Sequence, residues 1–265
     1  MAASAGSPLA LSRLERAENF PVALRALPKR HRNALRQAYS LARRIDDAGD
    51  DPAVGVDERL ARLDALEDEV RRCHAGTPLE RPFLDLIGAN RLDQTVHRYP
   101  AYADLLGYCR LSADPIGRIV LAIFGVEDVE AARLSDLVCT ALQILEHCQD
   151  VGEDRRDRDR IYLPAEDLAR FAVDETDLDA SVTSRPVRQL VAFEVERAER
   201  LLAEGAAIVG RLHGWARVAV AGYVAGGKAT VDAVRDADFD VLAGPPRPRL
   251  RRLARHAIPL LMGRT

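Results

Sequence analysis

The sequence predicts an all-α fold: one helical domain in which helices surround a central cavity. Apolar residues recur at spacings of three and four along most of the chain. No alternating strand pattern, hairpin dipeptide or internal repeat is visible. Helix-favouring Ala, Leu, Arg and Glu dominate a composition that is 48% hydrophobic and only 5% aromatic. We expect residues 1–12 to be a disordered N-terminus and residues 13–265 to form the domain.

The first part of the chain divides into five predicted helices. Pro21 and Pro28 punctuate a short first helix. A stripe of apolar residues predicts the next helix between Arg30 and Ile45, and Pro52 lies just beyond its end. The next three helices are expected at residues 57–73, 79–97 and 101–124.

The second part is predicted to begin with a long, largely buried helix at residues 127–151. The segments expected after it are a charged loop at 154–164, a short helix at 164–170, one or two helices at 185–218 and a helix at 218–236. We expect Gly226 and Gly227 to allow close helix packing, because they do not belong to a nucleotide-binding glycine motif.

Charge and cysteine usage exclude several classes of protein. The formal net charge is -3 and the sequence pI is near 6.1, so no nucleic acid partner is expected. The four cysteines form no CxxC pair and have no zinc-ligand spacing, which indicates reduced thiols. No signal peptide pattern and no membrane-spanning stretch is visible. We therefore expect a cytoplasmic protein.

Two pairs of aspartates repeat the same four-residue spacing at distant points of the chain. Asp46 and Asp50 form the first pair, and Asp150 and Asp154 form the second. On a helix this spacing places both carboxylates on one face, where they repel each other unless a cation lies between them. Taken alone, the first pair could equally be the solvated acidic end of a helix.

The second pair continues a polar face along an apolar helix. Gln143, His147, Asp150 and Asp154 keep spacings of three or four, so they share this face. A polar face on a largely buried helix is unfavourable unless it meets water or ions. Two such acidic helices facing each other would line a cavity suited to Mg²⁺ and to the phosphate oxygens of a substrate.

A tyrosine and an arginine precede the first pair. Tyr39 and Arg43 are one helical turn apart, so both could face the same cavity. The guanidinium of Arg43 could bind phosphate oxygens in a two-point contact. The alternative is an ion pair between Arg43 and Asp47 on the surface.

Four segments, in this order, resemble motifs of the squalene/phytoene synthase family. They are YSLARRIDDAGDD at 39–51, YCRLSADPIGR at 108–118, QILEHCQDVGED at 143–154 followed by RIYLP, and FDVL at 239–242. The resemblance implies an isoprenoid synthase fold of the head-to-head trans-prenyltransferase type. It also implies Mg²⁺, roughly two or three ions, acting on a prenyl diphosphate.

Within that family the sequence is most similar to the HpnC-type hydroxysqualene synthases. The segment ENFPVA at 18–23 and the pair Gln149-Asp150 carry this likeness, whereas other members usually have Asn at position 146 and Arg at position 149. Here these positions are Glu146 and Gln149. The resemblance implies a carbon–oxygen lyase that converts presqualene diphosphate and water to hydroxysqualene in squalene and hopanoid biosynthesis, without NADPH.

The resemblance also assigns roles to individual residues. The catalytic positions it implies are Tyr39, Arg43, Tyr108, Gln143 and Tyr162. The substrate-binding positions are Asn19, Phe20, Arg43, Glu146, Gln149 and Arg160, and the metal ligands are Asp46, Asp50, Asp150 and Asp154. Glu146 could instead pair with a nearby arginine. The charged run 155–160 could close over the diphosphate or stay a solvated loop.

Alternative functions remain open at this stage. One is a complete head-to-head prenyltransferase that makes squalene or phytoene from farnesyl or geranylgeranyl diphosphate, and another is a presqualene diphosphate synthase. A third is a non-catalytic lipid-binding or scaffold protein. The partners expected are a prenyl diphosphate and other enzymes of squalene or hopanoid synthesis. The arginine-rich tail from Arg247 to Thr265 could rest on the inner face of the membrane or dock on the domain.

Overall fold

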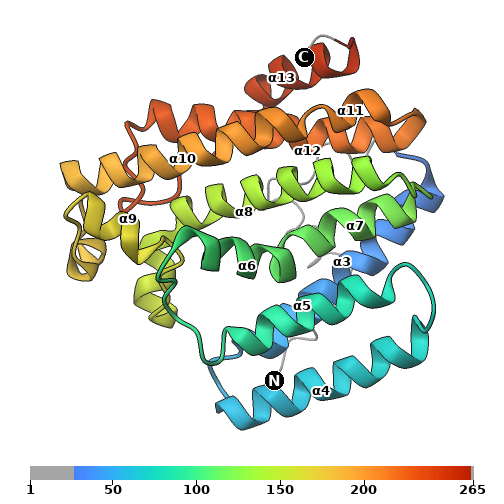
Figure 1. Cartoon of the computed structure of the whole chain (residues 1–265), viewed down its shortest axis with the longest axis horizontal. Helices are drawn as coiled ribbons and strands as arrows, with labels where there is room; N and C mark the ends of the chain where they lie inside the picture. The colour runs from blue at the N-terminus through green and yellow to red at the C-terminus, as the bar shows by residue number, and fades with distance from the viewer. Residues whose placement is uncertain (1–26, 264–265) are drawn as a thin grey trace, which may run out of the picture.

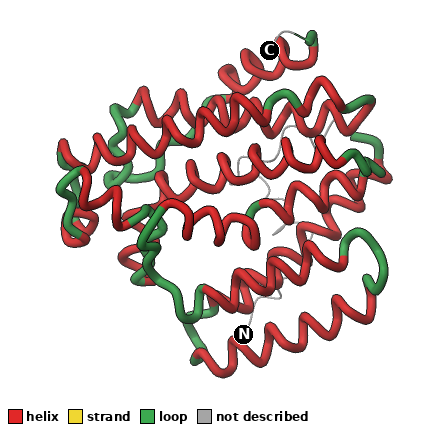
Figure 2. The backbone as a smooth tube through the Cα atoms, in the orientation of Figure 1, coloured by secondary structure: helices red, strands yellow, loops and turns green. Residues whose placement is uncertain are grey.

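The computed structural model describes residues 27–263, and helices make up the regular structure of that part (Figure 2). Within residues 27–263 the only extended pairing is an isolated bridge between Arg98 and Ile161. The all-α prediction is confirmed. The predicted binding residues Asn19 and Phe20, and the N-terminal segment 1–12, lie outside the described residues.

Eleven α-helices and one 3₁₀-helix lie between residues 27 and 263. In chain order they are α3 (Lys29–Asp50), α4 (Val56–Cys73), α5 (Glu80–Leu92), α6 (Tyr102–Ser112), α7 (Asp114–Ile123), α8 (Val129–Arg158), α9 (Ala165–Arg170), the 3₁₀-helix η1 (Glu175–Asp179), α10 (Arg185–Gly205), α11 (Ile208–Arg211), α12 (Gly214–Asp236) and α13 (Leu250–Leu261).

Helix α8 crosses the middle of the molecule (Figure 1). It packs against α6 and α7 on one side and against α10 and α12 on the other. Helices α3, α4 and α5 pack on one another, and α4 forms one edge of the molecule. Helix α13 packs on α12 at the opposite edge.

Two apolar cores hold these helices. The larger core joins α8, α10 and α12, with fully buried residues such as Ile144 and Leu202. The smaller core joins α3, α4 and α5 through residues such as Ile45, Leu63 and Ile87. The two acidic motifs therefore lie on helices anchored in different cores, α3 in the smaller and α8 in the larger.

The predicted charged loop at 154–164 is wrong at its start, because α8 continues to Arg158. Arg155 bonds to Asp159 and Arg158 bonds to Asp154, and both pairs span one helical turn. Asp159 then adopts a left-handed conformation, with φ of 50°, and ends the helix. Asp154 is therefore held on the helix rather than on a loop.

Other predicted boundaries also shift. The helix expected at 79–97 ends at Leu92, and the stretch 101–124 is two helices that meet at Ala113. Pro115 lies in the first turn of α7, where its missing N–H is tolerated, so the chain breaks and restarts there. Close packing at Gly227 is confirmed, because a Cβ there would lie 2.8 Å from a methyl carbon of Leu142.

Candidate active site

Helices α3 and α8 face each other across a cavity of about 590 Å³. Its wall is completed by residues of α5, α6, α7 and α12 and by Asp93, Arg160, Tyr162, Pro245 and Arg247. All twelve candidate site residues within the described part of the chain line this cavity: Tyr39, Arg43, Asp46, Asp50, Tyr108, Gln143, Glu146, Gln149, Asp150, Asp154, Arg160 and Tyr162.

The two aspartate pairs are brought together by this arrangement. Burial raises the pKa of Asp46 to about 6 and that of Asp154 to about 7. Burial also raises the pKa of Asp150. The shifts have one physical cause: loss of solvating water disfavours the ionised form of each carboxylate. A cation placed among them would offset this effect.

One arginine already lies between the two pairs. Arg158 Nη1 is 3.2 Å from Asp154 Oδ1 on its own helix, and its Nε is 3.5 Å from Asp50 Oδ2 on α3. The guanidinium thus bridges one aspartate of each pair. The space between the pairs is therefore suited to a positive charge shared by both helices.

The donor set fits Mg²⁺ better than a metal held by protein alone. Within residues 27–263 no group of three or more His, Cys, Asp or Glu side chains is close enough to hold an ion. Mg²⁺ does not require such a group, because it keeps several waters and takes one or two carboxylates together with phosphate oxygens. Two carboxylate pairs that face one cavity match that requirement.

A glycine lets α5 approach the first aspartate pair. A Cβ on Gly49 would lie 2.2 Å from Asn90 Oδ1, so only glycine leaves room for that side chain. Asn90 Nδ2 donates to Asp46 Oδ1 over 3.2 Å. Gln94 Nε2 donates to the carbonyl oxygen of Gly49 over 3.0 Å. The Asn90 amide thus orients Asp46, and the Gln94 amide ties the end of α3 to α5.

A buried carboxylate, Asp93, organises the wall at the end of α5. It accepts hydrogen bonds from Tyr108 Oη at 2.8 Å and from Tyr162 Oη at 3.2 Å. Arg160 donates to the Asp93 carbonyl at 3.2 Å and to Asp50 Oδ1 at 2.8 Å. Burial raises the pKa of Asp93 to about 6. Asp93 thereby links the tyrosines to the first aspartate pair.

Aromatic rings form the wall next to Asp93. The His147 ring stacks on Tyr162, with ring centroids 3.8 Å apart and an angle of 11° between planes. The Tyr108 ring lies 5.2 Å from Tyr162. Burial lowers the pKa of His147 to about 3, so the imidazole stays neutral. His147 thus contributes to this wall as a buried, uncharged ring stacked on Tyr162.

Glu146 and Gln149, the two positions that depart from the wider family, lie on the cavity side of α8. Gln143 Nε2 is 3.5 Å from Glu146 Oε2, and both side chains line the cavity. Gln149 donates to the carbonyl oxygen of Pro246. This hydrogen bond holds the segment 244–249 against the cavity mouth, where Arg247 joins the lining.

Arg43 lies at the cavity and also forms the ion pair that the sequence offered as an alternative. It lines the cavity with Tyr39, and its Nε is also 2.9 Å from Asp47 Oδ1. Asp47 is half-exposed and lies outside the main cavity. The guanidinium can leave this exposed pair at little cost, since such pairs contribute about 0–1 kcal/mol.

Among the lining residues that sequence reasoning missed, four belong to the contacts described above: Asn90, Asp93, Arg158 and Arg247. Asn90 lies in the last turn of α5 and Asp93 directly after it, with no repeated pattern to mark them. Arg158 was part of a charged run that the sequence placed in a loop. Arg247 was assigned only to the basic tail. Chain folding brings all four to the cavity.

Comparison with known proteins places this cavity in a family. The model of the squalene/phytoene synthase family matches residues 15–254. This chain belongs to the squalene/phytoene synthase family. Members of the family are isoprenoid synthases that act on prenyl diphosphates. The predicted family is confirmed.

Two relatives illustrate the range of the match. Over 213 residues the chain is 34% identical to a hydroxysqualene synthase of Sinorhizobium fredii, covering 75% of this chain and 73% of that one. Over 211 residues it is 30% identical to a 15-cis-phytoene synthase of Synechococcus elongatus, covering 69% and 68%. A hydroxysqualene synthase and a phytoene synthase therefore both match most of the chain.

Solved structures agree with the fold. Squalene synthase HpnC from Alicyclobacillus acidocaldarius is 39% identical, with a TM-score of 0.75 over 89% of this chain and 94% of that one. A dehydrosqualene synthase in complex with a ligand is 21% identical, with a TM-score of 0.82 over 96% and 94%, and shows the same fold. The isoprenoid synthase architecture is thereby confirmed.

In the described residues, no helix has both the length and the apolar character needed to cross a bilayer.

Proposed function

We propose that this chain is a hydroxysqualene synthase, which converts presqualene diphosphate and water to hydroxysqualene and diphosphate. The observation that carries the proposal is the pair of aspartates on α3 facing the pair on α8, across a cavity with an aromatic wall. The likeness to the Sinorhizobium fredii hydroxysqualene synthase supports this reaction within the family. The reaction makes the enzyme a carbon–oxygen lyase of squalene and hopanoid biosynthesis.

We propose Mg²⁺ as the metal, roughly two or three ions. Asp46 and Asp50 would hold it from α3, and Asp150 and Asp154 from α8. Bound there, Mg²⁺ supplies positive charge to the departing diphosphate.

Arginines at the cavity would bind the diphosphate itself. Arg160 is buried, and its Nε is a donor with no hydrogen-bond partner among the described residues. Arg43 and Arg247 line the same cavity from α3 and from the segment 244–249. Guanidinium groups form strong, directed hydrogen bonds with phosphate oxygens, so these three orient the leaving group.

In the proposed chemistry the carbon–oxygen bond of presqualene diphosphate breaks, and its electron pair leaves with the diphosphate. The resulting carbocation rearranges beside Tyr108 and Tyr162, whose ring faces attract positive charge. Asp93 holds both phenols in place through their hydroxyl groups. The ring faces of this wall therefore stabilise the cation while it rearranges.

Water completes the reaction. We propose that Gln143 and Glu146 orient a water whose oxygen attacks the rearranged cation, while a proton passes to the Glu146 carboxylate. Atoms and electrons balance without a reductant, so NADPH takes no part. The same two residues would be poorly suited to a reductive ending, which requires water to be kept away from the cation.

The cellular setting is proposed on the same grounds. A C30 diphosphate has little solubility in water, which favours a cytoplasmic enzyme in contact with the inner face of the membrane. Association with other enzymes of squalene and hopanoid synthesis stays a prediction.

The test is a paired incubation of the purified protein with Mg²⁺ and detergent, without NADPH, in water enriched in oxygen-18. One sample receives presqualene diphosphate and the other farnesyl diphosphate, and products are identified by mass spectrometry. We expect labelled hydroxysqualene from presqualene diphosphate alone. A matched sample of the Asp157→Asn variant, which changes an exposed carboxylate on α8, should behave as the wild type.

Other outcomes would contradict the proposal. Consumption of farnesyl diphosphate would favour a complete head-to-head prenyltransferase or a presqualene diphosphate synthase. Hydroxysqualene without the oxygen label would exclude capture by water. No turnover of either substrate by folded protein would favour a lipid-binding or scaffold role.

A further inference from the structure

Helix α13 is amphipathic and uses one side to pack on the domain. Leu253, Ala257 and Leu260 face the core, and His256 Nε2 lies 2.8 Å from Asp232 Oδ2 on α12. The helix lies at the edge of the molecule opposite α4 (Figure 1). Its other side therefore faces away from the domain.

That outer side carries an apolar stripe. Leu250 is 73% exposed, Ile258 57% and Leu261 39%. With Ala254, also exposed, they follow spacings of four, four and three, which align them along one face of the helix. Met262 continues the stripe with 63% of its surface exposed.

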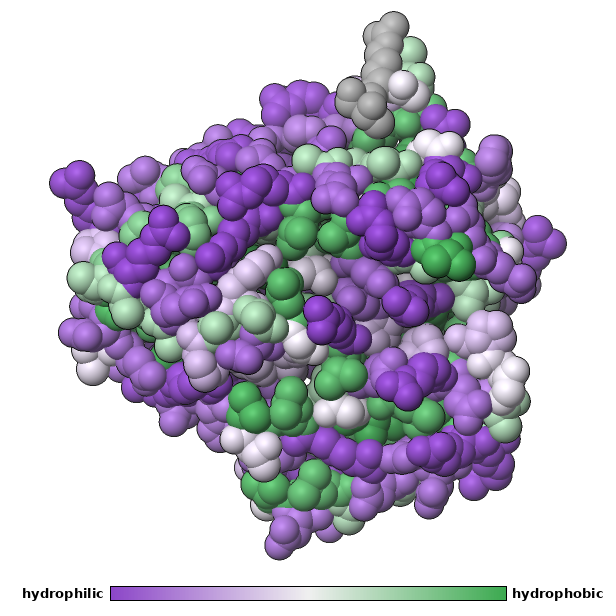
Figure 3. All heavy atoms as spheres, in the orientation of Figure 1, coloured by the Kyte–Doolittle hydropathy of each residue, from purple (hydrophilic) through white to green (hydrophobic). Residues whose placement is uncertain are grey.

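A tryptophan of α12 adds to this surface. Trp215 is 42% exposed at the start of α12. Arg217 Nη2 donates to the carbonyl oxygens of Leu260 and Leu261, which ties this end of α12 to the end of α13. Of the eight large hydrophobic residues exposed between residues 27 and 263, five therefore gather at the α12–α13 edge. On the face drawn in Figure 3, hydrophilic residues are interleaved with smaller hydrophobic areas. A contiguous exposed apolar surface is typical of an interaction site.

The charge of the same segment is entirely positive. Residues 243–265 contain six arginines and no Asp or Glu, although the whole chain has a net charge of -3. Arg249, Arg251 and Arg255 are exposed on or beside α13. A second copy of this chain would bring the same positive surface against itself, which like-charge repulsion disfavours. The complementary partner is an anionic surface that also accepts apolar side chains.

We propose that α13 and Trp215 form a docking surface for an anionic lipid bilayer. The stripe of Leu250, Ile258 and Leu261 enters the boundary between headgroups and acyl chains, and the arginines beside it contact lipid phosphates. Trp215 lies at the depth where tryptophan is favoured at membrane interfaces. The enzyme would rest on the membrane without spanning it. The inference is independent of which prenyl diphosphate the cavity accepts.

The test is co-sedimentation of the full-length protein with vesicles of phosphatidylcholine, with and without phosphatidylglycerol. We expect binding to require the anionic lipid and to weaken with added salt, because salt screens the arginines. The double variant Arg249→Gln/Arg251→Gln should bind roughly 25-fold more weakly, at about fivefold for each arginine. The double variant Leu250→Ser/Ile258→Ser should bind at least roughly tenfold more weakly.

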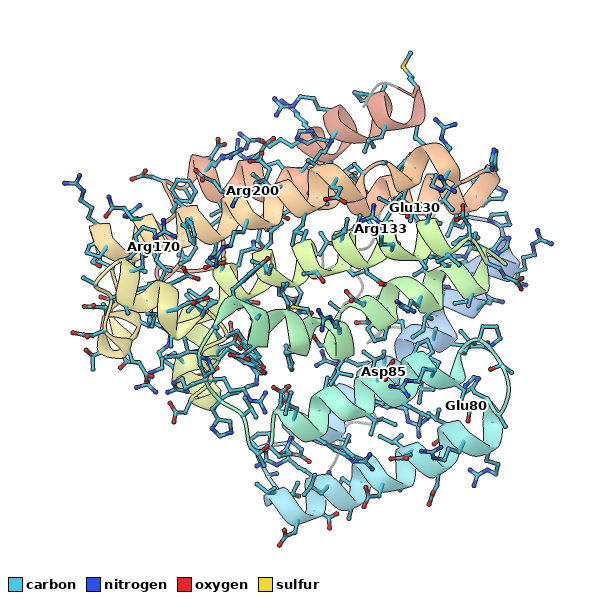
Figure 4. The ribbon with its side chains drawn as sticks, viewed as in Figure 1. Glu80, Asp85, Glu130, Arg133, Arg170 and Arg200 are labelled. Carbon is cyan, nitrogen blue, oxygen red and sulfur yellow. The ribbon has the colours of Figure 1, made fainter. Side chains whose placement is uncertain are left out.

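Matched controls place the same changes elsewhere. Val129→Ser/Val182→Ser alters two exposed apolar residues away from α13, and Arg170→Gln/Arg200→Gln alters two exposed arginines on α9 and α10 (Figure 4). Both controls should bind vesicles as the wild type does. All variants should keep their turnover in detergent, which separates docking from catalysis.

Three results would overturn the proposal. The first is wild-type protein that does not sediment with anionic vesicles, and the second is α13 variants that bind like the controls. The third is a dimer, seen by analytical ultracentrifugation, that the α13 variants dissociate. That result would assign the surface to a second copy of the chain.

Discussion

Asp50 and Asp154 come from different helices and share the guanidinium of Arg158. A cation is thus already part of the arrangement, supplied by the chain itself. Arg158 is only partly buried, so it can move toward solvent or substrate when another cation takes its position. Charge at this point of the cavity is therefore exchangeable, which a site for repeated diphosphate release requires.

The aspartate pairs lead to the first prediction. Replacing Asp46 or Asp150 by alanine should abolish turnover and leave the helical fold intact, because each removes a carboxylate from the cavity without altering an apolar core. Turnover with presqualene diphosphate and far-ultraviolet circular dichroism would measure the two properties. Asp157→Asn serves as the matched control on α8. Substantial activity in either alanine variant would refute the role of the paired carboxylates.

Gln149 leads to a second prediction. Gln149→Ala removes the hydrogen bond to Pro246 that holds Arg247 at the cavity. One such bond contributes about 1 kcal/mol, so affinity for the diphosphate should fall roughly fivefold. Arg247→Gln should give a similar loss, and the double variant should lose little more than either single one. Additive losses, measured as dissociation constants for inorganic diphosphate, would show that the two residues act separately.

At single positions, the sequence was most informative where spacing had a physical meaning. The interval of four between Asp46 and Asp50, and again between Asp150 and Asp154, predicted the carboxylate faces that the cavity brings together. Asp93 could not be predicted, because its importance comes from Tyr108 and Tyr162 folding onto it from other parts of the chain.

At the scale of elements, apolar periodicity located the helices but not their ends. α8 is longer than predicted because ion pairs one turn apart extend it through a segment that looks like a polar loop. The stretch 101–124 is broken at Ala113. Pro115 lies in the first turn of the new helix α7, where proline is tolerated, and not inside one continuous helix. Side-chain pairing and local backbone geometry therefore decided what hydrophobic pattern could not.

The contact between α9 and α10 contains a buried charge cluster. Arg197 pairs with Asp167 of α9 and lies 3.0 Å from Glu194 Oε1, which is fully buried. Two carboxylates thus share one guanidinium. Burial and the neighbouring Asp167 raise the pKa of Glu194 to about 8, so a proton is retained in the folded protein.

This cluster gives a third prediction. The folded pKa of Glu194 lies above its ordinary value of 4.5, so its contribution to stability is complete below pH 4.5 and is lost as pH rises toward 8. Glu194→Gln stays neutral, so its free energy of unfolding should fall less than that of the wild type over this range. Urea unfolding at several pH values would measure the difference. Parallel curves for the two proteins would contradict the assignment.

At the scale of the molecule, two groups of helices with separate cores meet around the cavity. Helix α3 brings one acidic face from the smaller core, and α8 brings the other from the larger core. The sequence predicted the fold class and the facing of these helices. It could not predict the closing segments, because the placement of residues 244–249 depends on contacts made only after the helices have packed.

The shared cavity gives a fourth prediction. Mg²⁺ should raise the melting temperature at pH 8, where the cavity carboxylates are ionised. The rise should be much smaller near pH 5.5, because Asp46 and Asp154, with pKa values of about 6 and about 7, then hold protons. Excess chelator should reverse the effect. The Asp150→Ala variant should lose it and Asp157→Asn should keep it, and equal stabilisation of both variants would place the metal elsewhere.

Gly49 shows how the first acidic motif depends on a helix outside the motif. Glycine inside a helix destabilises it by about 1 kcal/mol relative to alanine, so without another constraint mutation would tend to replace this glycine. Any side chain there meets Asn90, the residue whose amide holds Asp46. Over evolutionary time, positions 49 and 90 should therefore change together or stay fixed together. A lineage that gains a side chain at 49 must give up the one at 90, and must then find another way to orient Asp46.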